Sequence, residues 1–412
     1  MFVERSESRV RSARTAFVLV CLVPCAVLAA WAAYWKSGVH HDAAAAAWGR
    51  EIGLAVRCER VDHVRPGCVR LSNCKIGADD GSAAASFDVV EVETTPGEVR
   101  IRLPEFHATG EACAAIGRLA RNWLTEPARH PRAWLIDVAS VQWPDGDDGT
   151  RKSAPGVRVE CVAVGSERAV RIRREPATSD EVRIVRSADG QRGRFVIEAK
   201  VDDPVPAACV VAAIGLPVDG IAGWCSGSIA AEWSGDGWSG EASGSLDRFD
   251  ANSIASFFGS PMRMEGPARF DLVSATLSAG RIVRANATID VAPAVVSQEL
   301  LERFVQVMQC RAGEEYLGRD AVPSSLGVRQ VDRVACSLAI DASGARIRPA
   351  EAAGRGIVTA GGRTVLEAPS ETVAIERIPW AFAPRDARPV PATAATAWLT
   401  PLLPPSPSPE RR

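Results

Sequence analysis

The sequence predicts a mainly β protein with inserted helices, an α+β fold in which an N-terminal transmembrane helix precedes an elongated, curled antiparallel sheet. Three features predict this fold. Residues 15–35 carry no charged side chain. After residue 54, most of the chain consists of short segments in which apolar and polar residues alternate, the pattern of half-buried strands. Amphipathic helical patterns interrupt these segments near 111–126 and 295–311.

The uncharged run is a candidate membrane anchor, because a helix over 15–35 would be about as long as a bilayer's hydrocarbon core is thick, about 30 Å. A cleaved signal peptide is the competing interpretation, but its apolar core is typically about 7–15 residues long. The longer run and its aromatic end, which suits the membrane interface, favour a permanent anchor. The residues expected to contact the membrane are Phe17, Leu19, Leu22, Leu28, Trp31, Tyr34 and Trp35.

Basic residues flank the anchor unequally. Arg5, Arg9, Arg11 and Arg14 precede it, whereas only Lys36 follows closely. The positive-inside rule therefore predicts a single-pass protein with residues 1–14 in the cytoplasm and the body across the membrane.

The remaining chain divides into four predicted parts. An alanine-rich helix continues to about residue 53. Residues 54–216 form a first β-rich region with helices near 111–126 and 206–216, and residues 217–378 form a second with a helix near 295–311. Residues 379–412 are rich in proline and are expected to be a disordered tail.

Composition excludes some classes of protein and leaves one question about the cysteines. With 48 basic and 50 acidic residues, the chain lacks the basic excess of a nucleic-acid-binding protein, so no nucleic-acid partner is predicted. Nine cysteines lie outside the anchor, and none forms a CxxC pair. Two interpretations stay open for the densest group, Cys58, Cys68 and Cys74. They are small apolar core residues, or they form a disulfide in an oxidising compartment.

No catalytic or metal motif is recognisable, and the sequence predicts neither enzyme activity nor a cofactor. His40 and His41 are interpreted as a solvated pair rather than metal ligands. The acidic turn 145–149 lacks the later glutamate of a calcium loop. A serine–histidine–aspartate triad stays open, because its members can be far apart in sequence.

The N-terminal third of the body resembles a known family. The anchor and helix lead to REIGLAVRCERVDHVRPGCVRLSNCKIG, which places the strand residues 54–56, the turn 65–67 and the strand residues 69–76 in succession. This succession resembles the start of AsmA-like and TamB-like envelope proteins. GSIAAEWSGDGWSGEASGSLDRFD is similar to their glycine-punctuated strands, and GRIVRANATIDVAPAVVSQELLERF to a hairpin and helix nearer their C-terminus.

The resemblance covers about residues 10–310. It implies a protein of the bacterial inner membrane whose β-rich body lies in the periplasm and supports lipid transport or envelope integrity through an apolar groove. The expected partners are the bilayer, phospholipid acyl chains and other envelope proteins. The alternative is a non-catalytic periplasmic scaffold or assembly factor, because an apolar strand face can equally pack against helices such as 111–126.

Overall fold

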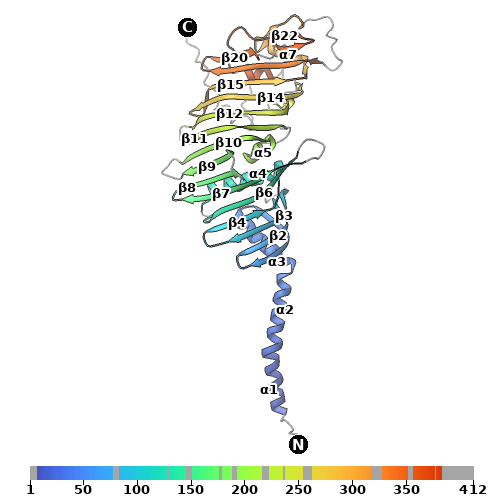
Figure 1. Ribbon diagram of the computed structural model, residues 1–412, viewed down its shortest axis with the longest axis vertical. Helices are drawn as coiled ribbons and strands as arrows, with labels where there is room; N and C mark the ends of the chain where they lie inside the picture. The colour runs from blue at the N-terminus through green and yellow to red at the C-terminus, as the bar shows by residue number, and fades with distance from the viewer. Residues whose placement is uncertain are drawn as a thin grey trace.

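The computed structural model of the protein describes residues 7–77, 83–127, 130–144, 151–175, 179–187, 193–215, 222–234, 237–253, 262–316, 327–350, 356–375 and 377–382. A helical stalk at the N-terminal end leads into one long sheet, whose strands follow one another along the same axis (Figure 1). The predicted fold class is confirmed: a mainly β body with inserted helices follows an apolar N-terminal helix.

The stalk consists of α1 (Glu7–Phe17), a π-helical turn η1 (Val18–Leu22) and α2 (Val23–Trp35). The wide turn precedes Pro24, which has no N–H to continue the helical hydrogen-bond ladder. The chain then bends, and α3 (Gly38–Ile52) begins where the Ser37 hydroxyl accepts a hydrogen bond from the His40 N–H at 3.4 Å. Gly53 ends α3 with a left-handed φ of 73°. The helix predicted to reach about residue 53 is therefore present but interrupted by this bend.

The large sheet is open and is built almost entirely from neighbours in the sequence. Its strands pair in the order β1, β2, β3, β4, β6 to β12, β14, β15 and β19; both β20 and β21 pair with β19, β22 pairs with β21, and β17 with β22. The strand bounds are β1 Ala55–Arg65, β2 Cys68–Gly77, β3 Ala83–Thr94, β4 Glu98–Leu103, β5 Phe106–His107, β6 Ala133–Pro144, β7 Arg151–Val164, β8 Glu167–Arg174, β9 Glu181–Ser187, β10 Arg194–Pro206, β11 Trp224–Ser234, β12 Gly237–Asp250, β14 Pro267–Ser278, β15 Arg281–Val291, β17 Arg311–Ala312, β19 Arg333–Asp341, β20 Gly344–Pro349, β21 Gly356–Ala360 and β22 Arg363–Glu367.

One part of the sheet departs from the predicted antiparallel pattern. Strands β4 and β5 both pair with β6 in parallel. Parallel neighbours need a crossover connection, and α4 (Gly110–Thr125) supplies it between β5 and β6. The helix predicted near 111–126 is therefore the crossover of a β–α–β unit, and it is what makes this pair parallel.

The C-terminal part carries a small second sheet of β13 (Met264–Glu265), β16 (Ala294–Ser297) and β18 (Val328–Val331). The helix predicted over 295–311 is shorter: residues up to Ser297 belong to β16, and α7 occupies Gln298–Gln306. The predicted tail also begins later than residue 379, because α8 (Arg377–Phe382) buries Ala381 completely. Residues 383–412 of the predicted tail lie outside the described part of the chain.

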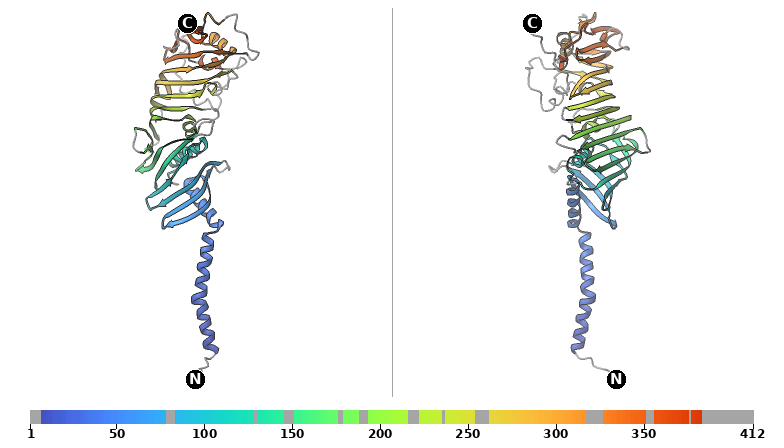
Figure 2. Two further views of the ribbon diagram at one scale, coloured as in Figure 1. Left: turned by 45° about the vertical axis from the view of Figure 1, so that its right-hand side comes forward. Right: turned by 90° about the vertical axis from the view of Figure 1, so that its left-hand side faces the viewer.

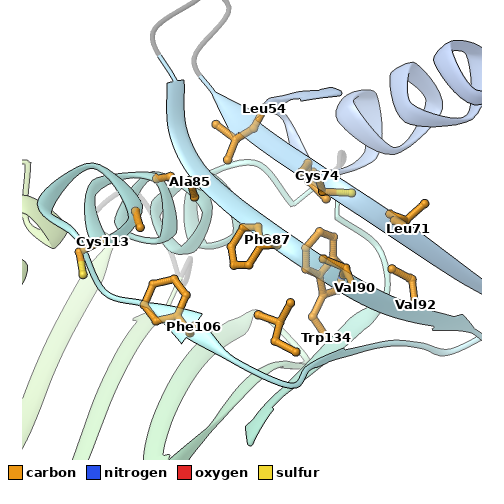
Figure 3. Close-up of a cluster of buried hydrophobic side chains, with 14 of the residues drawn as sticks. Leu54, Leu71, Cys74, Ala85, Phe87, Val90, Val92, Phe106, Cys113 and Trp134 are labelled. Carbon is orange, nitrogen blue, oxygen red and sulfur yellow. The ribbon is translucent and has the colours of Figure 1, made fainter. Parts of the chain in front are cut away.

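Two hydrophobic cores lie on the sheet, one toward each end. The first packs α3, α4 and α5 (Ala207–Ala213) on strands near the stalk, and Figure 3 shows its centre around Phe87, Phe106 and Trp134. The second lies under α7 and α8. Figure 2 shows α3 and α4 on one face of the strands. The sheet continues across the predicted boundary at 216–217 through the β10–β11 pair, so the two predicted regions share one sheet but have separate cores.

Candidate functional site

The residues predicted to contact the membrane lie on the stalk. Phe17, Leu19, Leu22, Leu28, Trp31 and Tyr34 are exposed, and Trp35 is partly buried where the stalk meets the body. The helix Arg14–Trp35 is long and apolar enough to span a membrane. Among the predicted topology residues, Arg11 and Arg14 are exposed on α1, Arg9 belongs to the same helix, and Arg5 lies outside the described residues.

Three of the five histidines gather where the stalk joins the sheet. The Nε2 atoms of His40 on α3 and His63 on β1 lie 3.3 Å apart, and the His41 Nδ1 lies 3.1 Å from the Glu59 carbonyl oxygen. The Trp35 ring contacts both members of the first pair, with centroids 4.6 Å from His40 and 4.1 Å from His63. Burial and the nearby His40 lower the pKa of His63, which favours its neutral form.

The histidines do not form a recognisable metal centre with other ligands. Within the described ranges, no group of three or more histidine, cysteine or acidic side chains is placed to hold a metal ion. The acidic turn at 145–149 lies outside those ranges.

The face of the sheet that carries the helices presents a continuous row of apolar residues. In cross-strand register, each residue lies directly opposite the next, from β2 near the stalk to β20 at the far end. The row consists of Val69, Val92, Ile101, Ile136, Val159, Ile172, Val182, Ala199, Ile229, Ala242, Ala275, Ala285, Ile340 and Ala345. Side chains paired in this way stand on the same face, so the row runs along the long axis of the sheet.

Between the two cores, this apolar face is only partly buried. We call this part the apolar strip and define it by six side chains that belong to neither core: Ile197, Ile229, Leu272, Leu277, Ile282 and Ile289. They come from β10, β11, β14 and β15, and each retains some exposure to solvent. A half-exposed apolar surface of this kind is typical of binding sites for apolar ligands or partners.

The opposite face carries charged residues in a second cross-strand row, one position along each strand from the apolar row. We call it the charged ladder; it consists of Asp62, Arg70, Glu91, Arg102, Asp137, Arg158, Arg173, Glu181 and Lys200. Ion pairs join Arg70 to Glu91 at 2.6 Å and Arg158 to Asp137 at 2.8 Å. This strict alternation of faces makes one side of the sheet polar and the other apolar.

A hollow of about 860 Å³ lies on the charged side, over strands β8 to β14. Charged side chains such as Arg171, Arg183 and Glu198 line one half, and hydroxyl side chains such as Ser228 and Ser243 line the other. Apolar residues such as Ala230 and Val273 also line it, so the hollow has a mixed lining and differs from the apolar groove that the family resemblance implies.

Seven of the nine cysteines outside the apolar helix are buried, including Cys58, Cys68 and Cys74, and four of the seven also lie in pairs. Cys58 lies directly opposite Cys74 across the β1–β2 ladder, whereas Cys68 lies opposite Arg65 and Glu93. The second pair joins Cys113 on α4 to Cys209 on α5, with the two thiols hydrogen-bonded. Sequence spacing offered no signal for this second pair, because its members belong to helices far apart in the chain.

No family model matches the chain, and no curated protein or solved structure matches it either. The function has to be inferred from the chain's own residues.

Proposed function

We propose that the chain is a membrane-anchored, AsmA-like envelope protein whose apolar sheet face holds lipid acyl chains. The observation that carries this proposal is the continuous apolar row from Val69 to Ala345, together with the partly exposed apolar strip between the two cores. The row begins on β2, close to the stalk, and extends away from it (Figure 1). Near the stalk, the row packs under the helices of the first core, so the part of the apolar face that is open to a lipid is the apolar strip between the two cores.

The two faces have complementary roles in this proposal. Acyl chains bind without directional contacts, because burial of apolar surface contributes about 25 cal/mol per Å². The apolar strip offers such surface, with branched side chains on four strands. The charged ladder keeps the other face in water. Only one face can then hold lipid.

The proposed location follows from the stalk. With Arg11 and Arg14 on the N-terminal side of the span, the N-terminus remains in the cytoplasm of a bacterial cell and the body lies in the periplasm. The helix is retained as a single-pass anchor, which keeps the start of the apolar row at the membrane surface.

Site-specific photocrosslinking in cells tests the lipid proposal. A photoreactive amino acid replaces Ile229 in the full chain, and mass spectrometry identifies the adducts. The matched control replaces Ala230, the next residue, which faces Glu198 and Glu241 on the charged side. We expect phospholipid adducts at 229 and none at 230.

Equal lipid adducts at the two positions, or none at 229, would overturn the proposal. Protein adducts at 229 in place of lipid would favour the alternative function, a scaffold that holds other envelope proteins at the membrane.

A further inference from the structure

Two pairs of thiols lie in contact inside the body. Cys58 and Cys74 are directly opposite each other on β1 and β2, and their side chains are hydrogen-bonded. Cys113 and Cys209 are hydrogen-bonded between α4 and α5. All four side chains are buried, with at most 9% of any residue exposed.

The backbone geometry of the first pair suits a disulfide. Directly opposed residues of antiparallel strands have Cα atoms about 4.5–5.5 Å apart. Disulfides span Cα separations of about 4.4–6.8 Å. Cys58 and Cys74 therefore need no backbone movement to be bridged.

The second pair lies where two helices cross closely. A Cβ atom added at Gly117 of α4 would lie 1.9 Å from the carbonyl oxygen of Ala213, so the helix backbones touch there. Cys113 lies one helical turn before Gly117, and Cys209 lies one turn before Ala213. The close crossing of α4 and α5, which requires a glycine at position 117, therefore also brings the thiols of Cys113 and Cys209 together.

We propose that Cys58–Cys74 and Cys113–Cys209 become two intramolecular disulfides when the body folds in an oxidising compartment. The inference rests on the proposed function only for that compartment, the periplasm. The first bond would join two neighbouring strands beside the stalk. The second would join α4 to α5 and so tie the parallel β4–β6 unit to the end of β10.

Each bond forms by two thiol–disulfide exchanges. A cysteine thiolate attacks the disulfide of an oxidant, either oxidised glutathione or the disulfide of an oxidoreductase, and forms a mixed disulfide. The second cysteine, as thiolate, displaces the oxidant's sulfur. Two S–H bonds are lost and one S–S bond is made, while two electrons and two protons reduce the oxidant to two thiols.

Hydrogen bonding makes the two thiols of each folded pair unequal. The thiol of Cys74 donates to Cys58, and that of Cys113 donates to Cys209, which lowers the pKa of Cys58 and Cys209. The same hydrogen bonds, together with burial, raise the pKa of Cys74 and Cys113. Because all four are buried in the folded body, oxidation accompanies folding.

Alkylation and mass spectrometry of the full chain test the pairing. The protein is extracted from membranes in N-ethylmaleimide, digested without reductant and analysed for cross-linked peptides. A second sample is unfolded and refolded in detergent with oxidised glutathione. We expect peptides linked through 58–74 and 113–209 in both samples, and a free thiol at Cys161, which is buried in the same core with its pKa raised to about 12 by burial.

Variants separate the pairing from simple packing. In Cys113→Ala, Cys209 should be alkylated because it has lost its partner. Reductant should then lower the melting temperature of this variant less than it lowers that of the wild-type protein. The matched control, Cys161→Ala, should keep the full effect of reductant. Alkylation of both Cys113 and Cys209 after refolding with oxidised glutathione, or a Cys209–Cys225 peptide, would overturn the proposal. Disulfides found only after refolding would support the pairing and instead contradict the periplasmic location.

Discussion

The Nε2 atoms of His40 and His63 lie 3.3 Å apart and connect α3 to the first strand of the sheet. His40 lies in the first turn of α3. Trp35, at the end of the stalk, packs against both rings. The joint between the apolar helix and the sheet is therefore formed by the three rings of Trp35, His40 and His63.

The stability of the protein should fall as the pH is lowered, because of His63 at the junction between the stalk and the sheet. The folded state lowers the pKa of His63 by burial and by the nearby His40, so the unfolded chain binds a proton more readily than the folded one. The contribution of His63 is complete above its unfolded pKa of about 6.5 and is lost as pH falls through the lower folded value. We expect His63→Gln to reduce the loss of melting temperature between pH 7.5 and 5. Identical slopes for the wild-type protein and His63→Gln would contradict the prediction.

The crossing of α4 and α5 should not tolerate a methyl group. Gly117→Ala places a Cβ 1.9 Å from the Ala213 carbonyl oxygen, so the helices must separate. Overpacking of this kind typically costs about 1–3 kcal/mol, measurable by denaturant unfolding of the full chain in detergent. Gly38→Ala is the matched control, because a Cβ there meets nothing within 4 Å. A loss at 117 no larger than that at 38 would show that the helices adjust freely.

Most of the fold could be predicted from the alternation of apolar and charged residues along the chain. It predicted strands with one buried face, and the structure aligns them so that Val92, Ile136 and Ile172 share one face while Glu91, Asp137 and Arg173 share the other. The apolar helix over 15–35 and the helix near 111–126 were also predicted from the sequence, because each depends on a pattern within one segment.

Features that depend on contacts between distant segments could not be predicted. The parallel β4–β6 pair follows from the path of α4, and the Cys113–Cys209 contact from the crossing at Gly117. At Asn73, a left-handed φ of 48° shifts the alternation of β2, so that Leu71 and Cys74 are both buried. Asparagine tolerates that conformation, but its presence alone does not indicate it. The apolar strip likewise requires the register of four strands, which no single strand specifies.

Ion pairs on the two faces should differ sharply in their contribution to stability. Arg174 and Asp180 lie 3.2 Å apart, with each side chain only 10% exposed, and Asp180 also accepts the Asp202 N–H. Arg174→Ala should cost about 3–5 kcal/mol in the free energy of unfolding, because it removes the arginine from a buried ion pair. The comparison is Arg70→Ala in the charged ladder, where Arg70 is 48% exposed and the expected loss is much smaller because water screens the ion pair. Similar losses for the two variants would contradict this difference.

The C-terminal end of α4 should be stabilised by the hydrogen bonds of one arginine more than by the positive charge of that arginine. Arg168 on β8 donates hydrogen bonds to the carbonyl oxygens of Trp123, Pro127 and His130, at 2.6, 3.1 and 2.7 Å, and its guanidinium lies 4.6 Å from the Trp123 ring. Carbonyls at a helix C-terminus lack partners within the helix, and the planar guanidinium reaches several of them at once.

Arg168→Ala should therefore destabilise the chain by about 2–3 kcal/mol, since hydrogen bonds to a charged group contribute about 1.5–3 kcal/mol and these carbonyls lose it together. Arg168→Lys keeps the positive charge but not the planar guanidinium with its several N–H donors. We therefore expect it to recover less than half of the stability that Arg168→Ala loses. Denaturant unfolding measures both variants, with Arg194→Lys on the exposed β10–β11 ladder as the control. Full recovery by lysine would mean that charge alone, through the helix dipole, stabilises this end of α4.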